Sequence, residues 1–219
     1  EKIEQIVPED VFLETGESDP ENLFENYTAG LFYYSGYDET ISRIIHGILH
    51  QRKCFVSYRS AYETVNKNFY AEPRRIVYFR GGLYVIIYIR RFEKFRLLAI
   101  QRIKHFEVLE EVHPEEPRFD PTLFWKNKFG LFSADSCHVK IEFSTSARMH
   151  IEGRHWHPSQ SFSEGKKGSL ILEMDVGLSP ELTSWIFSWN EYAKVLEPPE
   201  LIEKISKKID KLRKIYPTT

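Results

Sequence analysis

The sequence predicts an α+β protein: an amphipathic helix leads into a small Sm-like or SH3-like β-barrel, followed by a ferredoxin-like βαββαβ extension and a C-terminal helix. Three observations lead to this prediction. Short aromatic and β-branched runs crowd residues 54–112, and strand and helix patterns alternate over residues 138–198. A proline-rich stretch over residues 114–121 separates the two regions, and 219 residues are enough for two domains.

These patterns divide the chain into four segments. We expect an acidic linker region over residues 1–37, a barrel domain over 38–113, a connecting segment over 114–137 and an extension domain over 138–219. The linker is expected because glycines and prolines punctuate it and no periodicity is sustained. No run approaches the roughly 18 apolar residues of a membrane span, so we expect a cytoplasmic protein without a membrane partner.

The first predicted helix covers about residues 39–51. Asp38 is the expected N-cap. Apolar residues then recur at the spacing of one helical face, which is the pattern of an amphipathic helix: Ile41, Ile44, Ile45, Ile48 and Leu49.

Short strands make up the predicted barrel. The expected strands cover residues 54–58, 67–72, 75–79, 83–89, 95–100 and 104–112. Gly81-Gly82 is the expected hairpin turn, because a tight primed turn needs positive φ angles that glycine accepts without steric cost. Five or six short strands in about 60 residues favour a curled barrel over a sandwich.

The extension follows the order βαββαβ of a ferredoxin-like unit. The expected elements are strand 138–143, helix 145–153, strand 159–164, turn 164–168, strand 169–176, helix 180–189 and strand 193–198. Ser179 is the expected N-cap of its second helix, with Pro180 at the first helical position. A last helix begins at Pro198-Pro199 and is expected to bury Leu201, Ile205, Ile209 and Leu212.

Charge is unevenly distributed along the chain. The net charge is only −2, but residues 1–51 carry 2 basic and 11 acidic side chains, whereas residues 52–104 carry 13 basic and 3 acidic ones. The predicted barrel is therefore a concentrated basic module, which indicates an anionic partner.

Three stretches of the barrel together resemble a WYL domain, the small Sm-like barrel of bacterial transcriptional regulators. They are VSYRS at 56–60, EPRRIVYFRGGLYVI at 72–86 and FRLLAIQRI at 95–103. The later stretches EGRHWHPSQ at 152–160, LILEMDV and ELTSWIFSWNEYAKVLEP resemble the C-terminal extension that accompanies this domain. The resemblance covers roughly residues 40–215.

The resemblance implies a function. Such regulators carry an N-terminal winged helix-turn-helix and assemble as homodimers. No helix-turn-helix pattern is visible in residues 1–37, so we expect the chain to be the ligand-sensing and dimerising part, with double-stranded DNA contacted only through an upstream domain missing from it. The implied effector is a single-stranded nucleic acid fragment or a nucleotide messenger.

The resemblance also implies site residues. The family's Trp-Tyr-Leu falls on Leu83-Tyr84-Val85, and a strand tyrosine and a serine fall on Tyr58 and Ser60. Paired arginines fall on Arg96 and Arg102, Arg90 stands where many members have histidine, and Asn190 replaces a glycine that often follows the second helix of the extension.

Side-chain chemistry supports an anion site in the barrel. Arginine matches phosphate oxygens bidentately, and aromatic rings stack on bases. The predicted ligand-binding residues are therefore Tyr58, Ser60, Arg75, Tyr84, Arg90, Arg96 and Arg102, with Tyr88 as a further stacking surface. The alternative is that these arginines only solvate the strands and the tyrosines only pack.

Other functional classes have little support. His46 and His50 are one helical turn apart and His155 and His157 flank a tryptophan, but both spacings are weak metal signals, and we expect packing and hydrogen bonding instead. No GxSxG or P-loop motif occurs, so neither an enzyme nor a cofactor is expected. Cys54 and Cys137 are expected to be reduced thiols.

Trp185 and Trp189 lie at helical spacing and are expected in the core or at a dimer interface.

Two further interpretations of the function remain open. The chain could be a stand-alone nucleic-acid-binding accessory module, or a dimerisation scaffold whose barrel binds nothing.

Overall fold

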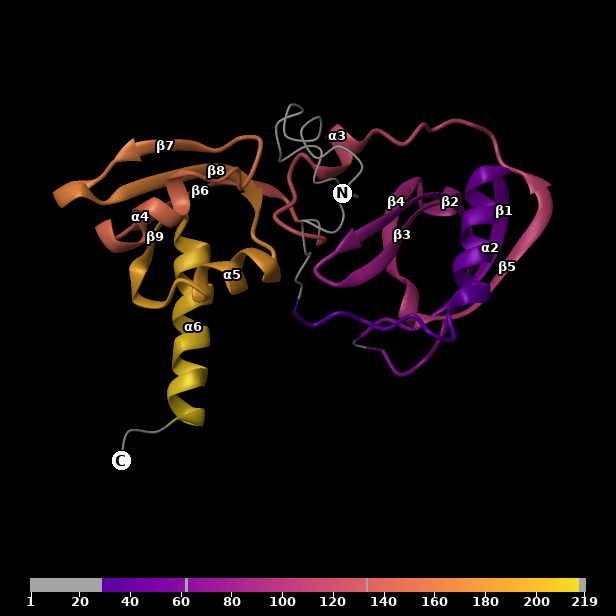
Figure 1. Ribbon diagram of the computed structural model, residues 1–219, viewed down its shortest axis with the longest axis horizontal. Coiled ribbons are helices and arrows are strands. Elements are labelled where there is room, and N and C mark those ends of the chain that lie inside the picture. The colour runs from indigo at the N-terminus through magenta and orange to yellow at the C-terminus, as the bar shows by residue number, and fades with distance from the viewer. Residues whose placement is uncertain (1–28, 62, 133, 217–219) are drawn as a thin grey trace, which may run out of the picture. The chain divides into compact units, whose positions relative to one another are not determined.

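The computed structural model describes residues 29–61, 63–132 and 134–216 as two compact units, the first ending at Glu116 and the second beginning at Pro117. Each contains an antiparallel sheet with helices, which confirms the α+β class (Figure 1). Most of the expected linker over residues 1–37 lies outside the described residues.

The first helix among the described residues is α2 (Asp38–Leu49), as the helical pattern predicts, although the N-cap is Tyr37 and Asp38 is already helical. The Asp38 side chain instead accepts a hydrogen bond from the Gly36 amide at 3.4 Å. Ile44 is fully buried, and Arg43 Nη1 donates to the Phe106 carbonyl at 3.0 Å, which fixes the helix along the fifth strand.

Five strands form the first sheet in the order β4-β3-β2-β1-β5. They are β1 (Arg52–Tyr58), β2 (Lys67–Phe79), β3 (Gly82–Ile89), β4 (Lys94–Ala99) and β5 (Ile103–Val112). The prediction of separate strands over 67–72 and 75–79 is wrong, because β2 runs through Pro73 with a register shift between Pro73 and Arg75.

Strand β2 is shared between two halves of this sheet. Its residues 67–71 pair with β1, and its residues 72–79 pair with β3. A register shift of this kind bends a strand and increases its twist. The bend at Pro73 lets the sheet curl around a core that includes Val56, Val85 and Phe106.

The β2–β3 hairpin turns one residue earlier than expected. Phe79 pairs with Gly82, so Arg80 and Gly81 are the central residues, with φ angles of 46° and 80°. Gly81 is also closely approached, since its carbonyl accepts a hydrogen bond from the Phe32 amide at 2.9 Å. A glycine is therefore needed at 81, whereas Gly82 belongs to the strand.

The second unit has the predicted ferredoxin-like topology. Its strands are β6 (Ser136–Phe143), β7 (Ser161–Glu164), β8 (Leu170–Gly177) and β9 (Ala193–Glu197), in the antiparallel order β7-β8-β6-β9. Its helices are α3 (Pro121–Trp125), α4 (Thr145–Glu152), α5 (Pro180–Phe187) and α6 (Pro199–Ile215). Ser179 is the N-cap of α5, as expected, and Asn190 has a φ of 49°.

An aromatic cluster fills the core of the second unit. The Trp185 ring lies 5.0 Å from that of Phe129 and 4.9 Å from that of Trp156, and its side chain is buried. Trp185 therefore belongs to the core, and partly buried Trp189 packs beside it. Ser179 Oγ donates to the Phe129 carbonyl at 3.0 Å and so ties the segment before β6 to α5.

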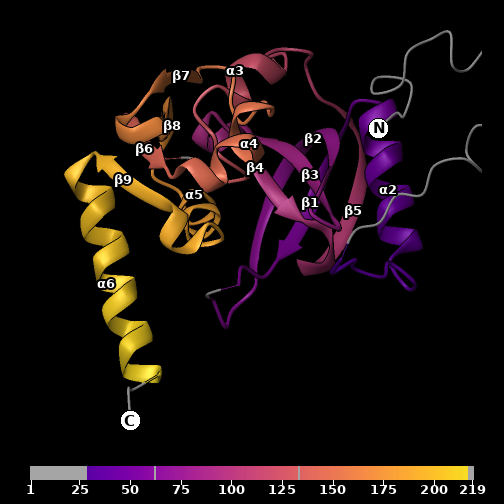
Figure 2. The same cartoon turned by 60° about the vertical axis from the view of Figure 1, so that its left-hand side comes forward.

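Helix α6 is less buried than the sequence predicts. Leu201 is fully buried and Ile205 packs partly against the core, but Ile209 and Leu212 are exposed. Figures 1 and 2 show why, because the C-terminal turns of α6 extend past the sheet of their own unit. Among the described residues, no helix is long and apolar enough to cross a membrane.

Candidate functional site

A pocket of about 780 Å³ opens on the first unit, beside β1, β2 and β5 and the 3₁₀ turn Arg90–Phe92 that follows β3. Its walls combine aromatic rings with basic side chains. The lining residues are Lys53, Phe55, Lys67, Asn68, Phe69, Tyr70, Ala71, Glu72, Ile89, Arg90, Arg91, Phe92, Leu109 and Glu111.

An aromatic pair forms one wall of the pocket. Phe55 on β1 and Tyr70 on β2 are direct cross-strand partners, and their ring centroids lie 5.6 Å apart in an edge-to-face arrangement. Tyr70 is 65% exposed. An exposed ring on a rigid strand is a surface on which a planar base can stack.

Basic side chains surround this aromatic wall. Lys53 forms an ion pair with Glu111, and Lys67 forms one with Glu63. The Arg91 guanidinium lies 5.7 Å from the centre of the Phe92 ring. Because ion pairs at the surface are weak, an anionic ligand can replace their carboxylates at little cost.

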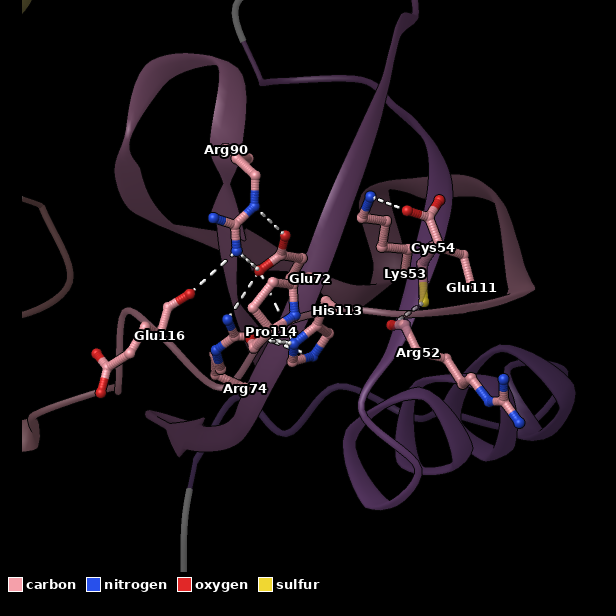
Figure 3. Close-up of polar contacts among 10 residues, drawn as sticks. All are labelled: Arg52, Lys53, Cys54, Glu72, Arg74, Arg90, Glu111, His113, Pro114 and Glu116. Carbon is pink, nitrogen blue, oxygen red and sulfur yellow. Dashed lines mark hydrogen bonds and ion pairs between the residues drawn. The ribbon is translucent and has the colours of Figure 1, made fainter.

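Glu72 is a buried carboxylate at the edge of the pocket, only 2% exposed (Figure 3). Arg74 Nη2 donates to Oε2 at 2.8 Å, and Arg90 donates from Nε to Oε1 at 2.8 Å and from Nη2 to Oε2 at 3.0 Å. Burial alone would raise the pKa of Glu72, but the hydrogen bonds and charges of Arg90 and Arg74 outweigh it and lower the pKa.

His113 is the fourth member of this cluster and is 4% exposed. Its Nδ1 lies 2.8 Å from the Pro114 carbonyl and its Nε2 lies 2.6 Å from Arg74 Nη1. A neutral ring that donates from Nδ1 and accepts at Nε2 satisfies both contacts. Burial lowers the pKa of His113, and the charge of Arg74 lowers it further, which favours this neutral form.

Arg90 joins the cluster to the end of the first unit. Its Nη2 also donates to the Glu116 carbonyl at 3.0 Å, as Figure 3 shows. The Arg90 guanidinium lies 5.5 Å from the centre of the Tyr88 ring, and its side chain is 46% exposed. Arg90 therefore touches the pocket, the buried carboxylate and the segment 113–116 at once.

The structure does not gather all of the predicted site residues. Arg90 lines the pocket. Arg75 pairs with Ile86 and Arg96 pairs with Ile87, so these two arginines point to opposite faces of the sheet, because neighbouring strand residues alternate. Tyr84 lies on the same face as Ile86 and Arg75.

The remaining predicted residues lie at the C-terminal end of β1. The Tyr58 hydroxyl accepts a hydrogen bond from the Ala99 amide at 3.4 Å, and its ring packs partly against the core. The Arg59 amide donates to the Arg102 carbonyl at 3.1 Å, which places Arg102 beside the loop that contains Ser60. The role of all seven residues in ligand binding stays a prediction.

Several pocket residues were not singled out from the sequence: Lys53, Phe55, Lys67, Tyr70 and Glu72. The available signal was the alternation of Asn68, Tyr70 and Glu72 along β2, which places these three side chains on one face.

The histidine pairs form no metal site in the described part of the chain, where no group of three His, Cys, Asp or Glu side chains could hold an ion. The His46 and His50 rings lie with their centroids 4.4 Å apart and their planes tilted by 45°. His157 is buried beside Ser159, whose Oγ lies 2.7 Å from His157 Nδ1. Cys54 and Cys137 are both free, and burial raises the pKa of Cys54 to about 12.

Comparisons with known proteins match both units. A family model described as the WYL domain matches residues 39–108, and one described as the WCX domain matches residues 135–213. A search of curated proteins finds no match.

Solved structures add information on the fold. The chain is similar to proteasome accessory factor B/C (PafBC) of Arthrobacter aurescens, with 16% identity, coverage of 87% of this chain and 29% of that one, and a TM-score of 0.41. It is also similar to a CRISPR Cas-related protein, with 12% identity, coverage of 82% and 52%, and a TM-score of 0.57. The chain thus spans about half or less of either structure, and the second match supports the fold alone.

Proposed function

Because this chain belongs to the WYL-domain family and carries a WYL domain followed by a WCX domain, we propose that it is the ligand-sensing and dimer-forming region of a transcriptional regulator. Its ligand is phosphate-rich: a single-stranded nucleic acid fragment or a nucleotide messenger. Ligand binding controls an upstream winged helix by favouring one conformation, through a difference in affinity between conformations. The proposal assigns no catalytic residue.

The observation that carries this proposal is the exposed Tyr70 ring among basic side chains. A base stacks on Tyr70 while phosphates contact Lys53, Lys67 and Arg91 around the same pocket. This combination is typical of proteins that bind single strands, where rings hold the bases and cations follow the backbone.

We further propose that the chain forms a homodimer through α6. Its residues Ile202, Ile205, Ile209, Leu212 and Tyr216 are spaced by alternating intervals of three and four, the repeat of a coiled-coil seam. Four of them are exposed in the single chain, all except the partly buried Ile205. A second copy of α6 would cover this stripe.

Fluorescence anisotropy with a dye-labelled single-stranded 10-mer tests the ligand site, with cyclic nucleotides as competitors. Tyr70→Ala combined with Arg91→Ala is expected to weaken binding at least about tenfold, given the usual strength of base stacking. Arg96→Ala combined with Arg102→Ala is the comparison variant, because neither residue lines the pocket.

The two double variants decide where the ligand binds. Loss of affinity in the Arg96 and Arg102 variant alone would move the site to the residues that the family resemblance implies. Failure of the wild-type chain to bind either the oligonucleotide or any cyclic nucleotide would refute the proposed function.

A further inference from the structure

We propose that the free edge of β2, the side of residues 67–71 that faces away from β1, binds an extended acidic peptide of a partner protein as an added strand. This inference goes beyond the proposed function, because it requires no nucleic acid ligand. It concerns the same pocket, however, so the peptide and an oligonucleotide are expected to compete for it.

The free edge exists because β2 and β3 separate. Tyr88 is the last residue of β3 that pairs with β2, opposite Glu72, and the chain then turns away through the 3₁₀ turn Arg90–Phe92. Residues 67–71 therefore pair with β1 on one side only. Within the described residues, no strand pairs with their other side, and no loop or side chain forms hydrogen bonds with their amides or carbonyls.

The backbone of the free edge is suited to pairing with another strand. In an antiparallel pair, alternate residues direct both their N–H and their C=O groups away from the partner strand, so about two or three of residues 67–71 present these groups along the edge. At about 3.4 Å per residue, the edge has room for a strand of about five residues. Peptides that add to such unpaired edges gain affinity from backbone hydrogen bonds.

The pocket follows this edge. Asn68 and Tyr70 line it from the outward face of β2, and Phe69 and Ala71 line it from the face that packs on the core. Side chains from opposite faces of a strand share a pocket where the pocket follows the edge of that strand. Phe92, from the turn after β3, also lines the pocket and is 57% exposed. The edge is thus open to a peptide, and Tyr70 and Phe92 offer rings for one of its apolar side chains.

The charges around the free edge favour an acidic peptide. Cationic side chains outnumber carboxylates in the lining of the pocket. The cations are Lys53, Lys67, Arg90 and Arg91. Of the two carboxylates, Glu72 is buried and already bound by two arginines, and Glu111 is paired with Lys53. Complementary charge favours acidic partners over basic ones.

A second strand fits the free edge better than a nucleic acid does. Its donors and acceptors repeat every two residues, which is the spacing of the edge itself. Nucleotides lack this repeat and bind single-strand sites through stacking and phosphate contacts. Lys67, Tyr70 and Arg91 would contact either occupant, which is why the two are expected to compete.

Fluorescence anisotropy on the whole chain tests this inference with a defined probe, the fluorescein-labelled peptide Glu-Val-Glu-Phe-Glu-Val-Glu. We expect saturable binding. The same peptide with a methyl group on every backbone nitrogen keeps its charge but cannot donate to the edge, so it should bind at least about tenfold more weakly.

Charge reversal tests the electrostatic part of the inference. Lys67→Glu combined with Arg91→Glu reverses two exposed charges of the pocket and should weaken peptide binding at least about tenfold. Lys94→Glu combined with Lys104→Glu is the matched control, because both lysines are exposed on the same unit but do not line the pocket. This control should bind the peptide as the wild type does.

Amide hydrogen exchange followed by NMR detects the added strand itself. When the peptide binds, alternate amides of residues 67–71 should exchange at least about tenfold more slowly, because they become hydrogen-bonded to the peptide. A peptide held only by side-chain charges would protect no such alternate set.

The outcomes separate this inference from the proposed function. Peptide binding that is weakened by methylation and by charge reversal, with alternate amides protected, supports the added strand. No peptide binding by the wild type, or equal binding of the methylated peptide, overturns it. Protection of these amides by the 10-mer alone, or by raising the concentration of the free chain, also overturns it, because a nucleic acid or a second copy would then cover the edge. A chain that binds the peptide but no oligonucleotide or cyclic nucleotide refutes the proposed function and leaves this inference standing.

Discussion

Arg90 and Glu72 are joined at two points, with Nε 2.8 Å from Oε1 and Nη2 3.0 Å from Oε2, although they are 18 residues apart in the sequence. Arg74 binds the same carboxylate, so one buried negative charge serves two arginines. Removing it leaves both arginines without their anion, and the Arg74 side chain is largely buried, at 9% exposed.

We therefore expect Glu72→Ala to lower the free energy of unfolding by about 3 kcal/mol, the usual cost of breaking a buried ion pair from one side. Glu111→Ala is the control, because Glu111 is 62% exposed where it pairs with Lys53, and it should cost less than about 1 kcal/mol. Urea unfolding followed by circular dichroism measures both. Equal losses would show that the Glu72 cluster stabilises the protein no more than the exposed Lys53–Glu111 pair does.

Gly81 is expected to be the least replaceable glycine of the β2–β3 hairpin. Its φ is 80°, and an added Cβ would lie 2.7 Å from the Gly30 carbonyl oxygen. We expect Gly81→Ala to destabilise the protein by about 2 kcal/mol, from strain and overlap together.

Gly153→Ala is the matched control for Gly81→Ala. Gly153 has a φ of −79°, and its added Cβ would meet nothing within 4 Å. The unfolding midpoint of the Gly153→Ala variant should equal that of the wild type or lie slightly above it. If Gly81→Ala unfolds at the midpoint of Gly153→Ala, the turn does not require glycine.

Oligonucleotide binding should weaken as salt rises. For single strands the slope of log K against log salt is about −0.7 for each phosphate contact. Lys67→Gln should therefore make the slope less steep by about 0.7, whereas Tyr70→Ala should lower affinity at every salt concentration and leave the slope unchanged. A wild-type slope near zero would contradict phosphate contacts.

Stability should fall on mild acidification because of His113. Its folded-state pKa lies below the ordinary value of about 6.5, so the unfolded chain binds the proton more readily. The stabilisation is complete above that value and is lost as the pH falls from about 6.5 towards the folded-state pKa, at up to about 1.4 kcal/mol per pH unit.

His113→Gln should be less stable at neutral pH but should vary less with pH over this window. Buried His157 also has a lowered pKa and contributes the same trend in both proteins, so the difference between the two pH profiles isolates His113. Parallel profiles would show that His113 is not held neutral.

The exposed stripe of α6 predicts an effect on oligomeric state. Leu212→Glu places a charge on the proposed seam and should shift a dimer towards monomer in analytical ultracentrifugation. Lys214→Glu also alters charge but lies off the stripe, and it should leave the dimer intact. A monomeric wild-type chain would refute the proposed homodimer.

Local sequence patterns predicted most elements of both units, because helix and strand periodicity are local properties. The ferredoxin-like order and the Ser179 cap follow from such patterns. The continuity of β2 through Pro73 was missed, since a proline inside a strand normally indicates a break. The burial of Ile209 and Leu212 was also wrong, because periodicity shows which face is apolar but not whether anything covers it.

The candidate site was less predictable than the fold. Glu72, Arg74, Arg90 and His113 come from three separate stretches, and only the folded sheet brings them together. The basic composition of residues 52–104 indicated an anionic partner, but it could not distinguish Arg90, which binds a buried carboxylate, from the exposed Arg96.

The aromatic core of the second unit has a practical consequence. All four tryptophans, at positions 125, 156, 185 and 189, follow residue 116, whereas the pocket belongs to the first unit and contains none. Indole emission is thus a built-in reporter on one half of the chain only. A change in that emission on titrating the pocket would be an optical signal of communication between the halves, obtained without attaching any dye.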